Sequence, residues 1–387
     1  MSIILYKKNI MQKKFILILY FCKRERILKN YRMESSKEKN QTTRENGEIV
    51  SMLQPHIISA SRSTDIPAFY SDWFFHRLKT GYSAWTNPFN GVKSYISYHN
   101  TRFIVFWSKN PRPLLGHMHK LMDRNINCYV QYTLNDYEKE QMEVNVRPLA
   151  ERIETFHLLK EKLGLGGVIW RFDPLMLTST VGVDELLRKV ENIGNQLKGA
   201  TEKLVFSFAD ILEYRKVKSN LDNNRIPYRI WDIEQMEEFA EGLSNLNRQW
   251  DFKLATCGEK IDIGKYGIEH NRCIDGDLII QRAYKDKALM DYMGVKLITP
   301  ETSLFGESNI PADAIMLPNG QYFSSVHKKD RGQRGLCGCM TAKDIGEYNT
   351  CPHLCEYCYA NTSKEIAMAN FRHAVGNGLR AETITGR

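Results

Sequence analysis

Short apolar runs alternate with amphipathic segments from residue 56 to about residue 260. The runs are rich in β-branched and aromatic side chains and are apolar on both faces, which is typical of parallel strands covered by helices. Each run ends in polar residues and is followed by apolar residues at helical spacing. The pattern predicts seven β–α units, with strands at 56–60, 82–86, 103–107, 128–133, 168–172, 204–208 and 252–256.

The segments between the strands carry the end signals of helices. Asp65 as N-cap and Gly81 as terminator bound a helix predicted to open at Pro67. The alternation predicts an α/β fold with a parallel sheet. We favour a (β/α) TIM-like barrel over an open sheet, because no G-x-G-x-x-G follows the first strand and seven strands leave one place in an eight-stranded barrel. Later helices are expected at 148–163, 183–197 and 232–246.

A C-terminal segment is the candidate for the eighth strand. Residues 344–350 lead directly into a cysteine-rich loop, and residues 361–375 predict a closing helix. We therefore expect this strand to close the barrel and to carry the cysteine loop, with the order of elements permuted. Residues 261–336 are expected to form an irregular connection across the barrel mouth, with one helix near 277–292.

The net charge of +9 is concentrated at the N-terminus. Residues 1–50 hold 12 Lys or Arg and 5 Asp or Glu, so the rest of the chain is nearly neutral. We expect residues 1–52 to be a disordered basic extension, with Met33 or Met52 as an alternative start, and residues 53–387 to be one domain. The apolar run at 15–22 is far shorter than the roughly 20 residues that span a bilayer. These features predict a cytoplasmic protein without a membrane partner.

Three of the nine cysteines stand in a C-x3-C-x2-C pattern at Cys351, Cys355 and Cys358. This spacing can direct three thiolates toward one point, which indicates a soft metal centre in a reduced compartment. Iron–sulfur is favoured over zinc because the spacing is unusual among zinc sites. The zinc alternative takes a further thiolate from Cys337 or Cys339 in the nearby C-x-C pair. Together with Cys257 and Cys273, that pair also provides enough thiols for a second cluster, a question that the spacing leaves open.

The cysteine triplet, with an aromatic residue just before its last cysteine, resembles the signature of radical SAM enzymes. The resemblance implies that Cys351, Cys355 and Cys358 bind three irons of a [4Fe-4S] cluster and that S-adenosylmethionine binds the fourth. In those enzymes the motif lies near the N-terminus, and the following strand ends in Gly-Gly-Glu. Here the following strand would be 56–60, which ends in Ser-Arg-Ser, and the nearest similar sequence is Cys257-Gly258-Glu259 on another strand.

Polar residues that follow the predicted strands are candidates for chemistry, because strand carboxyl ends form the active-site face of a barrel. Arg62, Lys109 and Arg171 together would suit an anionic substrate. Glu259 is a candidate for S-adenosylmethionine binding or acid–base work. Asp65 and Asp173 complete the set, although helix capping is the favoured interpretation for each carboxylate.

Four motifs resemble the domain-of-unknown-function family 1848: residues 58–70, 105–111, 257–259 and 337–361. The resemblance implies a bacterial cytoplasmic protein without an established activity, in a family sometimes grouped by name with DNA-repair photolyase-like radical SAM proteins.

Three hypotheses follow from these observations. The first is a radical SAM-like iron–sulfur enzyme that acts on an unknown anionic substrate. The second is a non-catalytic or regulatory barrel protein with a structural zinc site. The third is a nucleic-acid modifying or repair enzyme, which rests on the family grouping, while the nearly neutral body of the chain argues against a large phosphate footprint.

Overall fold

Eight parallel strands form the central sheet in the computed structural model, which describes residues 41–87, 90–298, 310–324, 329–330, 332–333 and 335–386. Six of the seven predicted strands lie in this sheet, so the predicted α/β fold with a parallel sheet is confirmed. The strand order is β13–β12–β10–β8–β7–β6–β3–β17, which follows the chain except that the last strand lies beside the first. The strands are β3 (Ile57–Ala60), β6 (Phe103–Ser108), β7 (Asn127–Thr133), β8 (Val168–Leu175), β10 (Lys203–Phe208), β12 (Lys253–Thr256), β13 (Ile268–His270) and β17 (Lys343–Asp344).

The C-terminal strand β17 joins the sheet as predicted, although it is two residues long and does not span 344–350. Lys343 pairs with Ile58 and Asp344 with Ser59, in parallel register. The Ile345 N–H then donates to the Ser59 carbonyl at 3.1 Å, after which the chain leaves the sheet. Strands β13 and β17 form the two edges, and no ladder joins them in the described part of the chain. The parallel sheet is therefore observed, whereas its closure into a barrel is not.

A second sheet corrects two expectations. It has the order β1–β2–β5–β4, built from β1 (Gln41–Thr43), β2 (Ile49–Leu53), β5 (Lys93–Ser97) and β4 (Tyr82–Thr86). The run at 82–86 was predicted to join the parallel sheet, but it pairs antiparallel with β5. Residues 41–53, most of which were expected to be disordered, form two strands, and Met52 is buried in the core. Residues 1–40, including Met33, lie outside the described residues.

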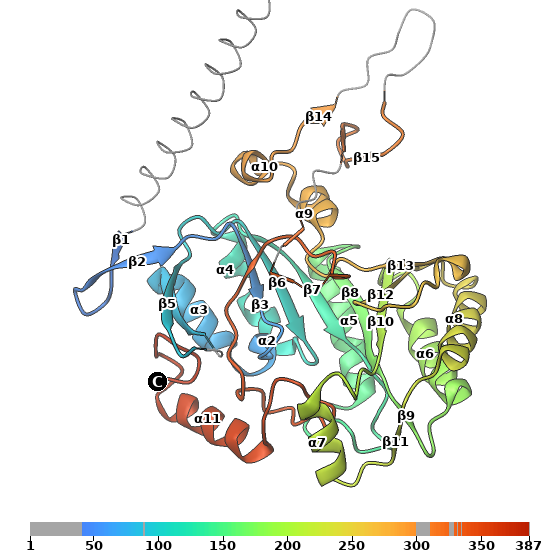
Figure 1. Cartoon of the computed structure of the whole chain (residues 1–387). Helices are drawn as coiled ribbons and strands as arrows, with labels where there is room; N and C mark the ends of the chain where they lie inside the picture. Colours follow the sequence, from blue (N-terminus) through green and yellow to red (C-terminus); the bar gives the residue numbers. More distant parts are fainter. Residues whose placement is uncertain are drawn as a thin grey trace, which may run out of the picture.

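Helices cover one face of the central sheet, as Figure 1 shows. Apolar side chains from that face, among them Phe106, Trp170 and Phe206, pack into one core with Phe156, Ile193 and Phe239 of the helices. The helix predicted for 67–81 is divided at Tyr70, and Gly81 ends its second part in the left-handed conformation, at φ 98°. The helices are α2 (Ile66–Phe69), α3 (Ser71–Thr80), α4 (His119–Met122), α5 (Leu149–Leu163), α6 (Val183–Leu197), α7 (Arg215–Asn223), α8 (Ile233–Asn247) and α11 (Lys364–Gly376).

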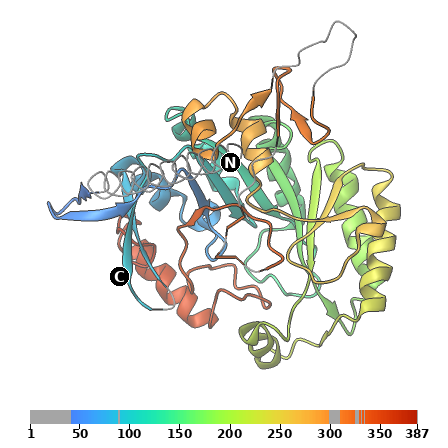
Figure 2. The ribbon, with the colours of Figure 1, turned by 45° about the horizontal axis from the view of Figure 1, so that its top comes forward.

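The opposite face of the sheet is covered by α9 (Gly276–Ala283) and α10 (Lys287–Met293). Ile279 and Ile280 of α9 pack in one cluster with Phe103, Tyr129 and other inward side chains of the strands. The Arg282 guanidinium donates to the carbonyls of Cys128 and Leu163, at 3.1 and 2.9 Å, near the amino ends of β7 and β8. The expected single helix is thus two helices, and α9 lies at the amino ends of these strands rather than across the barrel mouth. Figures 1 and 2 show α9 and α10 at the end of the sheet that lies opposite α7.

The remaining elements are short. They are the 3₁₀ helices η1 (Arg112–His117) and η2 (Gly264–Tyr266), the ribbon of β9 (Leu177–Thr178) with β11 (Tyr228–Arg229), and a small sheet of β14 (Leu297–Ile298), β16 (Tyr322–Ser324) and β15 (Ala314–Met316). Within the described residues, no helix has the length and apolar character needed to cross a membrane.

Candidate metal centre

The cysteine loop, residues 350–361, follows β17 and is fixed by hydrogen bonds from three other parts of the chain. The Tyr70 hydroxyl donates to the Thr350 carbonyl at 2.6 Å. The Asn145 side chain donates to the Pro352 carbonyl at 2.9 Å, and its backbone N–H donates to the His353 carbonyl at 3.1 Å. Further along the loop, the Asn220 amide of α7 donates to the Cys358 carbonyl at 3.3 Å. The loop is therefore held in one conformation by contacts that do not involve its thiols.

The three cysteines of this loop are partly buried. Cys355 interacts electrostatically with both Cys351 and Cys358, so the three side chains lie in one neighbourhood. Burial raises the pKa of Cys351 to about 12, and burial also raises the pKa of Cys355 well above its ordinary value. The thiols are therefore protonated on their own, and a bound metal would have to displace these protons.

Backbone N–H groups point at two of the three sulfurs. Cys351 accepts from the N–H groups of Asp65 and His353. Cys358 accepts from those of Ala360 and Asn361. Hydrogen bonds of this kind to ligating sulfurs tune iron–sulfur clusters. The donor set thus fits a thiolate-bound cluster.

A site for a single metal ion is not formed by this loop. No group of three or more His, Cys, Asp or Glu side chains in the described part of the chain is arranged to hold one ion.

Asp65 connects the first β–α loop to the cysteine loop. It caps α2 as predicted, accepting from the Ala68 N–H at 3.0 Å. Its other oxygen lies 2.7 Å from His353 Nε2. Burial would raise the pKa of Asp65, but its hydrogen bonds with His353, with the Lys109 N–H and with the Ser108 hydroxyl together lower the pKa below its ordinary value, so the carboxylate is ionised. Capping and a role in positioning the cysteine loop therefore coexist at this residue.

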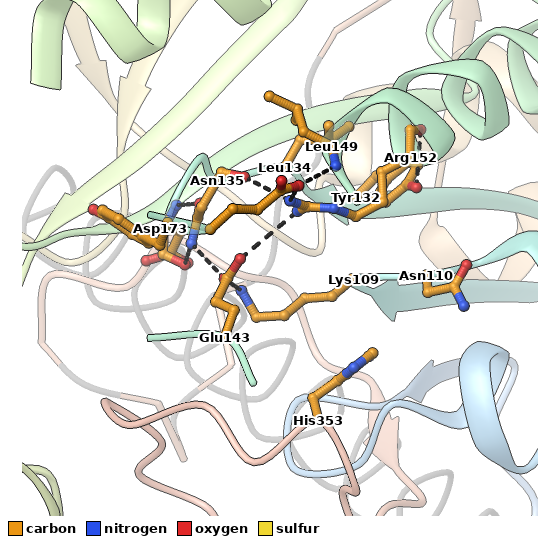
Figure 3. Close-up of polar contacts among 12 residues, drawn as sticks. Lys109, Asn110, Tyr132, Leu134, Asn135, Glu143, Leu149, Arg152, Asp173 and His353 are labelled. Carbon is orange, nitrogen blue, oxygen red and sulfur yellow. Dashed lines mark hydrogen bonds and ion pairs between the residues drawn. The ribbon is translucent and has the colours of Figure 1, made fainter. Parts of the chain in front are cut away.

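Glu143 is buried between two cations, Lys109 and Arg152, as Figure 3 shows. Lys109 Nζ donates to its carboxylate at 2.7 Å, and Arg152 lies 3.7 Å from its other oxygen. The Tyr357 hydroxyl, from within the cysteine loop, donates to the same carboxylate. Burial opposes ionisation of Glu143, but Lys109 and Arg152 outweigh it and lower the pKa to about 2. Glu143 therefore carries a permanent negative charge that fixes Tyr357.

Lys109 and the two predicted arginines do not share one location. Lys109 is bound to Glu143 and to the Tyr357 hydroxyl, at 2.7 and 3.0 Å. The guanidinium carbons of Arg62 and Arg171 each lie 5.2 Å from the ring centroid of Trp107. The predicted convergence of basic groups is thus observed for the two arginines, whereas Lys109 is neutralised at the cysteine loop.

Asp173 is not a helix cap, contrary to the favoured interpretation, because β8 continues to Leu175 and α6 begins only at Val183. Its carboxylate binds the Arg171 guanidinium and accepts from the Ser207 hydroxyl. Asp173 is therefore the counter-ion of Arg171.

Glu259 lies at the end of β12 and accepts from the Phe208 N–H at 2.9 Å. It lines a cavity of about 660 Å³ together with Asp210, Glu213 and Tyr214. The Tyr214 ring lies 5.8 Å from that of Tyr359, which follows the last cysteine of the loop. The cavity thus borders the cysteine loop through this pair of rings.

Cys337 and Cys339 lie with Cys273 rather than with the loop triplet. Cys339 interacts directly with both Cys273 and Cys337, and the Cys273 sulfur lies 3.5 Å from that of Cys257. The zinc hypothesis assigned a thiolate of the C-x-C pair to the triplet, and this arrangement does not favour it.

Sequence reasoning missed Glu143, His353 and Trp107. Glu143 stands in a polar loop, where a carboxylate is ordinary, and its partners Lys109 and Arg152 are distant in sequence. The one available signal for His353 was its position between two cysteines.

Comparisons with known proteins give a family but no relative with a described activity. No curated protein and no solved structure matches the chain. A family model described as a domain of unknown function, DUF1848, matches residues 57–360, which include every candidate site residue discussed above. The chain therefore belongs to the DUF1848 family.

Proposed function

We propose that this protein is an iron–sulfur enzyme of the radical SAM type, with its cluster held by Cys351, Cys355 and Cys358. The observation that carries the proposal is the loop itself. Its three partly buried cysteines lie in one neighbourhood, the loop is fixed by contacts from other elements, and backbone N–H groups favour the thiolate form of Cys351 and Cys358. Three protein ligands on a four-iron cluster would leave one iron open, which is the feature of a catalytic rather than a structural site.

Buried polar contacts around the loop support a reactive centre at this place. When bound, a cluster of this kind supplies an electron to S-adenosylmethionine. The chain fixes the loop through a buried hydrogen bond between Asp65 and His353 and through a buried ion pair between Glu143 and Lys109. The cationic Lys109 also lies close enough to Cys355 to favour its thiolate form.

The cavity beside the loop is the proposed position of S-adenosylmethionine. Carboxylates of Asp210, Glu213 and Glu259 line it together with one cation, Lys260, which is paired with Glu213, so the carboxylates exceed the cation by two. S-adenosylmethionine carries a sulfonium and an ammonium group, and an acidic lining favours such a cation by simple Coulomb attraction. Glu259 retains the role that the sequence suggested for it, as a binding group for this cofactor.

The proposed substrate is anionic, and Arg62 is its binding group. Arg62 is only partly buried, and its guanidinium stacks on Trp107. Arg171 is almost fully buried and already bound to Asp173, so its proposed role is to position Trp107, over whose ring its guanidinium also lies. A planar guanidinium with free edges can bind carboxylate or phosphate in a bidentate manner.

Anaerobic purification and reconstitution with iron and sulfide test the proposal. We expect the reconstituted wild type to hold about four more irons per chain than the Cys355→Ala variant, and to show, after reduction, a [4Fe-4S] signal in electron paramagnetic resonance that this variant lacks. We also expect 5′-deoxyadenosine when the reduced protein is mixed with S-adenosylmethionine. Cys128→Ala is the matched control, because Cys128 is buried in β7, outside the loop. A folded protein with zinc and no iron–sulfur signal at the loop would refute the assignment.

A further inference from the structure

Four cysteines outside the loop lie together on the face of the sheet that α9 and α10 cover. They come from three parts of the chain: Cys257 follows β12, Cys273 precedes α9, and Cys337 with Cys339 precedes β17. Cys257 and Cys273 have their sulfurs 3.5 Å apart, and Cys339 interacts with both Cys273 and Cys337. Cys128 is the remaining cysteine of the described residues, and it lies in the core on the other face of the sheet. The four thus converge although up to 82 residues separate them in sequence.

N–H donors surround the sulfurs of this group. Cys273 accepts from the Asn271 amide at 3.0 Å and from Arg171 Nη1 at 3.1 Å. Cys339 accepts from the Ile274 backbone N–H at 3.4 Å. Arg171 and Asn271 are both more than nine-tenths buried, so their N–H groups are directed at sulfur in place of water. Such donors favour a thiolate, the form that binds metal.

The backbone around the group is closely packed. The Met340 N–H donates to the Ile274 carbonyl at 3.1 Å, which joins the C-x-C segment to the segment that carries Cys273. A side chain at Gly338 would place its Cβ 3.0 Å from Arg272 Cγ. The segment that carries Cys273 and the segment that carries Cys337 and Cys339 therefore pack against each other through contacts that involve no metal.

We propose that Cys257, Cys273, Cys337 and Cys339 form a second metal centre, a four-thiolate site for zinc or for an iron–sulfur cluster. No group in the described residues is already arranged around a single ion, so metal binding must draw these four sulfurs closer together. Four protein thiolates leave no open position, so this centre serves structure or electron transfer rather than direct chemistry on a substrate. Binding replaces the thiol protons, which pass to solvent, and needs no change of oxidation state at sulfur. A disulfide is the competing use of these thiols, and it would need Cys257 and Cys273 to approach from 3.5 Å to about 2.05 Å.

The second centre is connected to the cysteine loop by contacts across the sheet. Arg171 joins Cys273 to Asp173, and the Asn135 amide donates both to the Asp173 carbonyl at 3.1 Å and to the Tyr357 hydroxyl at 3.0 Å. Tyr357 lies between two loop cysteines. The two cysteine sets are thus parts of one buried polar network, although they share no ligand.

The test uses the full chain with Cys351, Cys355 and Cys358 all changed to alanine, so that metal at the loop cannot contribute. The protein is purified without oxygen, and separate samples receive ferrous iron with sulfide, or Zn²⁺ alone. We expect about four irons or one zinc per chain to remain bound after gel filtration. Which of the two samples retains metal identifies the centre. Because the three loop cysteines are absent from this variant, the result does not depend on whether the proposed radical SAM function holds.

Single replacements in that background complete the test. Cys337→Ser and Cys273→Ser are each expected to abolish retention of the metal, and Cys128→Ser is expected to leave it unchanged. Cys337 is only half-buried, so its variant should fold even if the Cys273 variant does not, and circular dichroism checks this. A folded triple-alanine chain that retains neither metal would overturn the proposal. So would a Cys257–Cys273 disulfide in the wild-type protein purified without oxygen.

Discussion

His353 Nε2 and Asp65 Oδ2 lie 2.7 Å apart, although 288 residues separate them in the chain. The same carboxylate accepts from the Ser108 hydroxyl and the Lys109 N–H, each at 2.7 Å. One buried side chain thus joins the start of α2, the end of β6 and the cysteine loop. Removing this side chain should therefore weaken the packing of α2, β6 and the cysteine loop against one another.

Replacing Asp65 should therefore destabilise the protein strongly. Asp65→Ala leaves His353 and several N–H or O–H donors without a buried acceptor, and we expect a loss of about 3 kcal/mol in the free energy of unfolding. Urea denaturation measures it. Asp72→Ala is the control, because its side chain is 77% exposed and should cost less than about 1 kcal/mol. Equal losses in the two variants would mean that the contact with His353 contributes little.

Glu143 offers a second test of buried charge. Glu143→Ala leaves Lys109 and Arg152 as uncompensated cations inside the protein, and we expect a cost of about 3–5 kcal/mol. The reference is Glu154→Ala, which removes an exposed ion pair with Arg112 and should change the free energy of unfolding by no more than about 1 kcal/mol. Thermal or urea unfolding of the two variants side by side gives the comparison. A mild effect at Glu143 would contradict the buried ion pairs described here.

Gly346 is predicted to tolerate no side chain. A Cβ at this position would lie 1.8 Å from Ser61 Oγ and 2.7 Å from Ser63 Oγ, so Gly346→Ala must displace the first β–α loop from β17. Overpacking of this kind costs typically about 1–3 kcal/mol, and here we expect the upper end. Gly376→Ala, where nothing lies within 4 Å of the added carbon, should be neutral or slightly stabilising. Differential scanning calorimetry measures the melting temperature of each variant, and equal melting temperatures for Gly346→Ala and Gly376→Ala would contradict the prediction.

Glu382 should make stability depend on pH. Burial would raise its pKa, but the hydrogen bonds and charge of Arg44 and the hydrogen bond from Tyr82 lower it below its ordinary value of 4.5. A carboxylate with a lowered pKa stabilises the folded state above its ordinary pKa, and this stabilisation is lost as the pH falls through the folded-state pKa. Glu382→Gln should therefore be less stable than the wild type near neutral pH, and the difference should shrink below about pH 4.

Unfolding curves at several pH values measure this difference. Glu161→Gln, on the exposed face of α5, is the control and should follow the wild type throughout. A constant gap between Glu382→Gln and the wild type from neutral to acid pH would exclude the ionic contribution.

The parallel strands were predictable because each is a continuous apolar run between polar ends, as at β6 and β10. Strand β4 has the same appearance in sequence, yet it pairs antiparallel with β5, because local pattern does not encode the partner of a strand. Strands β13 and β17 have three and two residues and little apolar character, so their place depends on tertiary contacts alone. The C-terminal strand was found only because a conspicuous motif follows it.

In the candidate site, too, some features could be predicted from the local sequence and others depend on tertiary contacts. The cysteine triplet could be read from its spacing, and Arg62 and Arg171 from their position after strands. Their separation from Lys109 could not, because it is set by Glu143, a residue in a polar loop whose burial arises only when Lys109 and Arg152 close around it. The grouping of Cys257 and Cys273 with the C-x-C pair likewise needs the fold, since these residues are far apart in sequence.

The position of β17 beside β3 has a consequence for how the protein is made. A ribosome completes β3 early and the cysteine loop only some 290 residues later, so the edge of β3 that receives β17 stays unpaired for most of synthesis. The docking surface for the loop, including Asp65, is then finished before the loop exists. If the triplet binds metal as proposed, the metal would be loaded only after nearly the whole chain has been made. A product that ends before residue 343 contains seven of the eight strands of the central sheet but lacks the triplet.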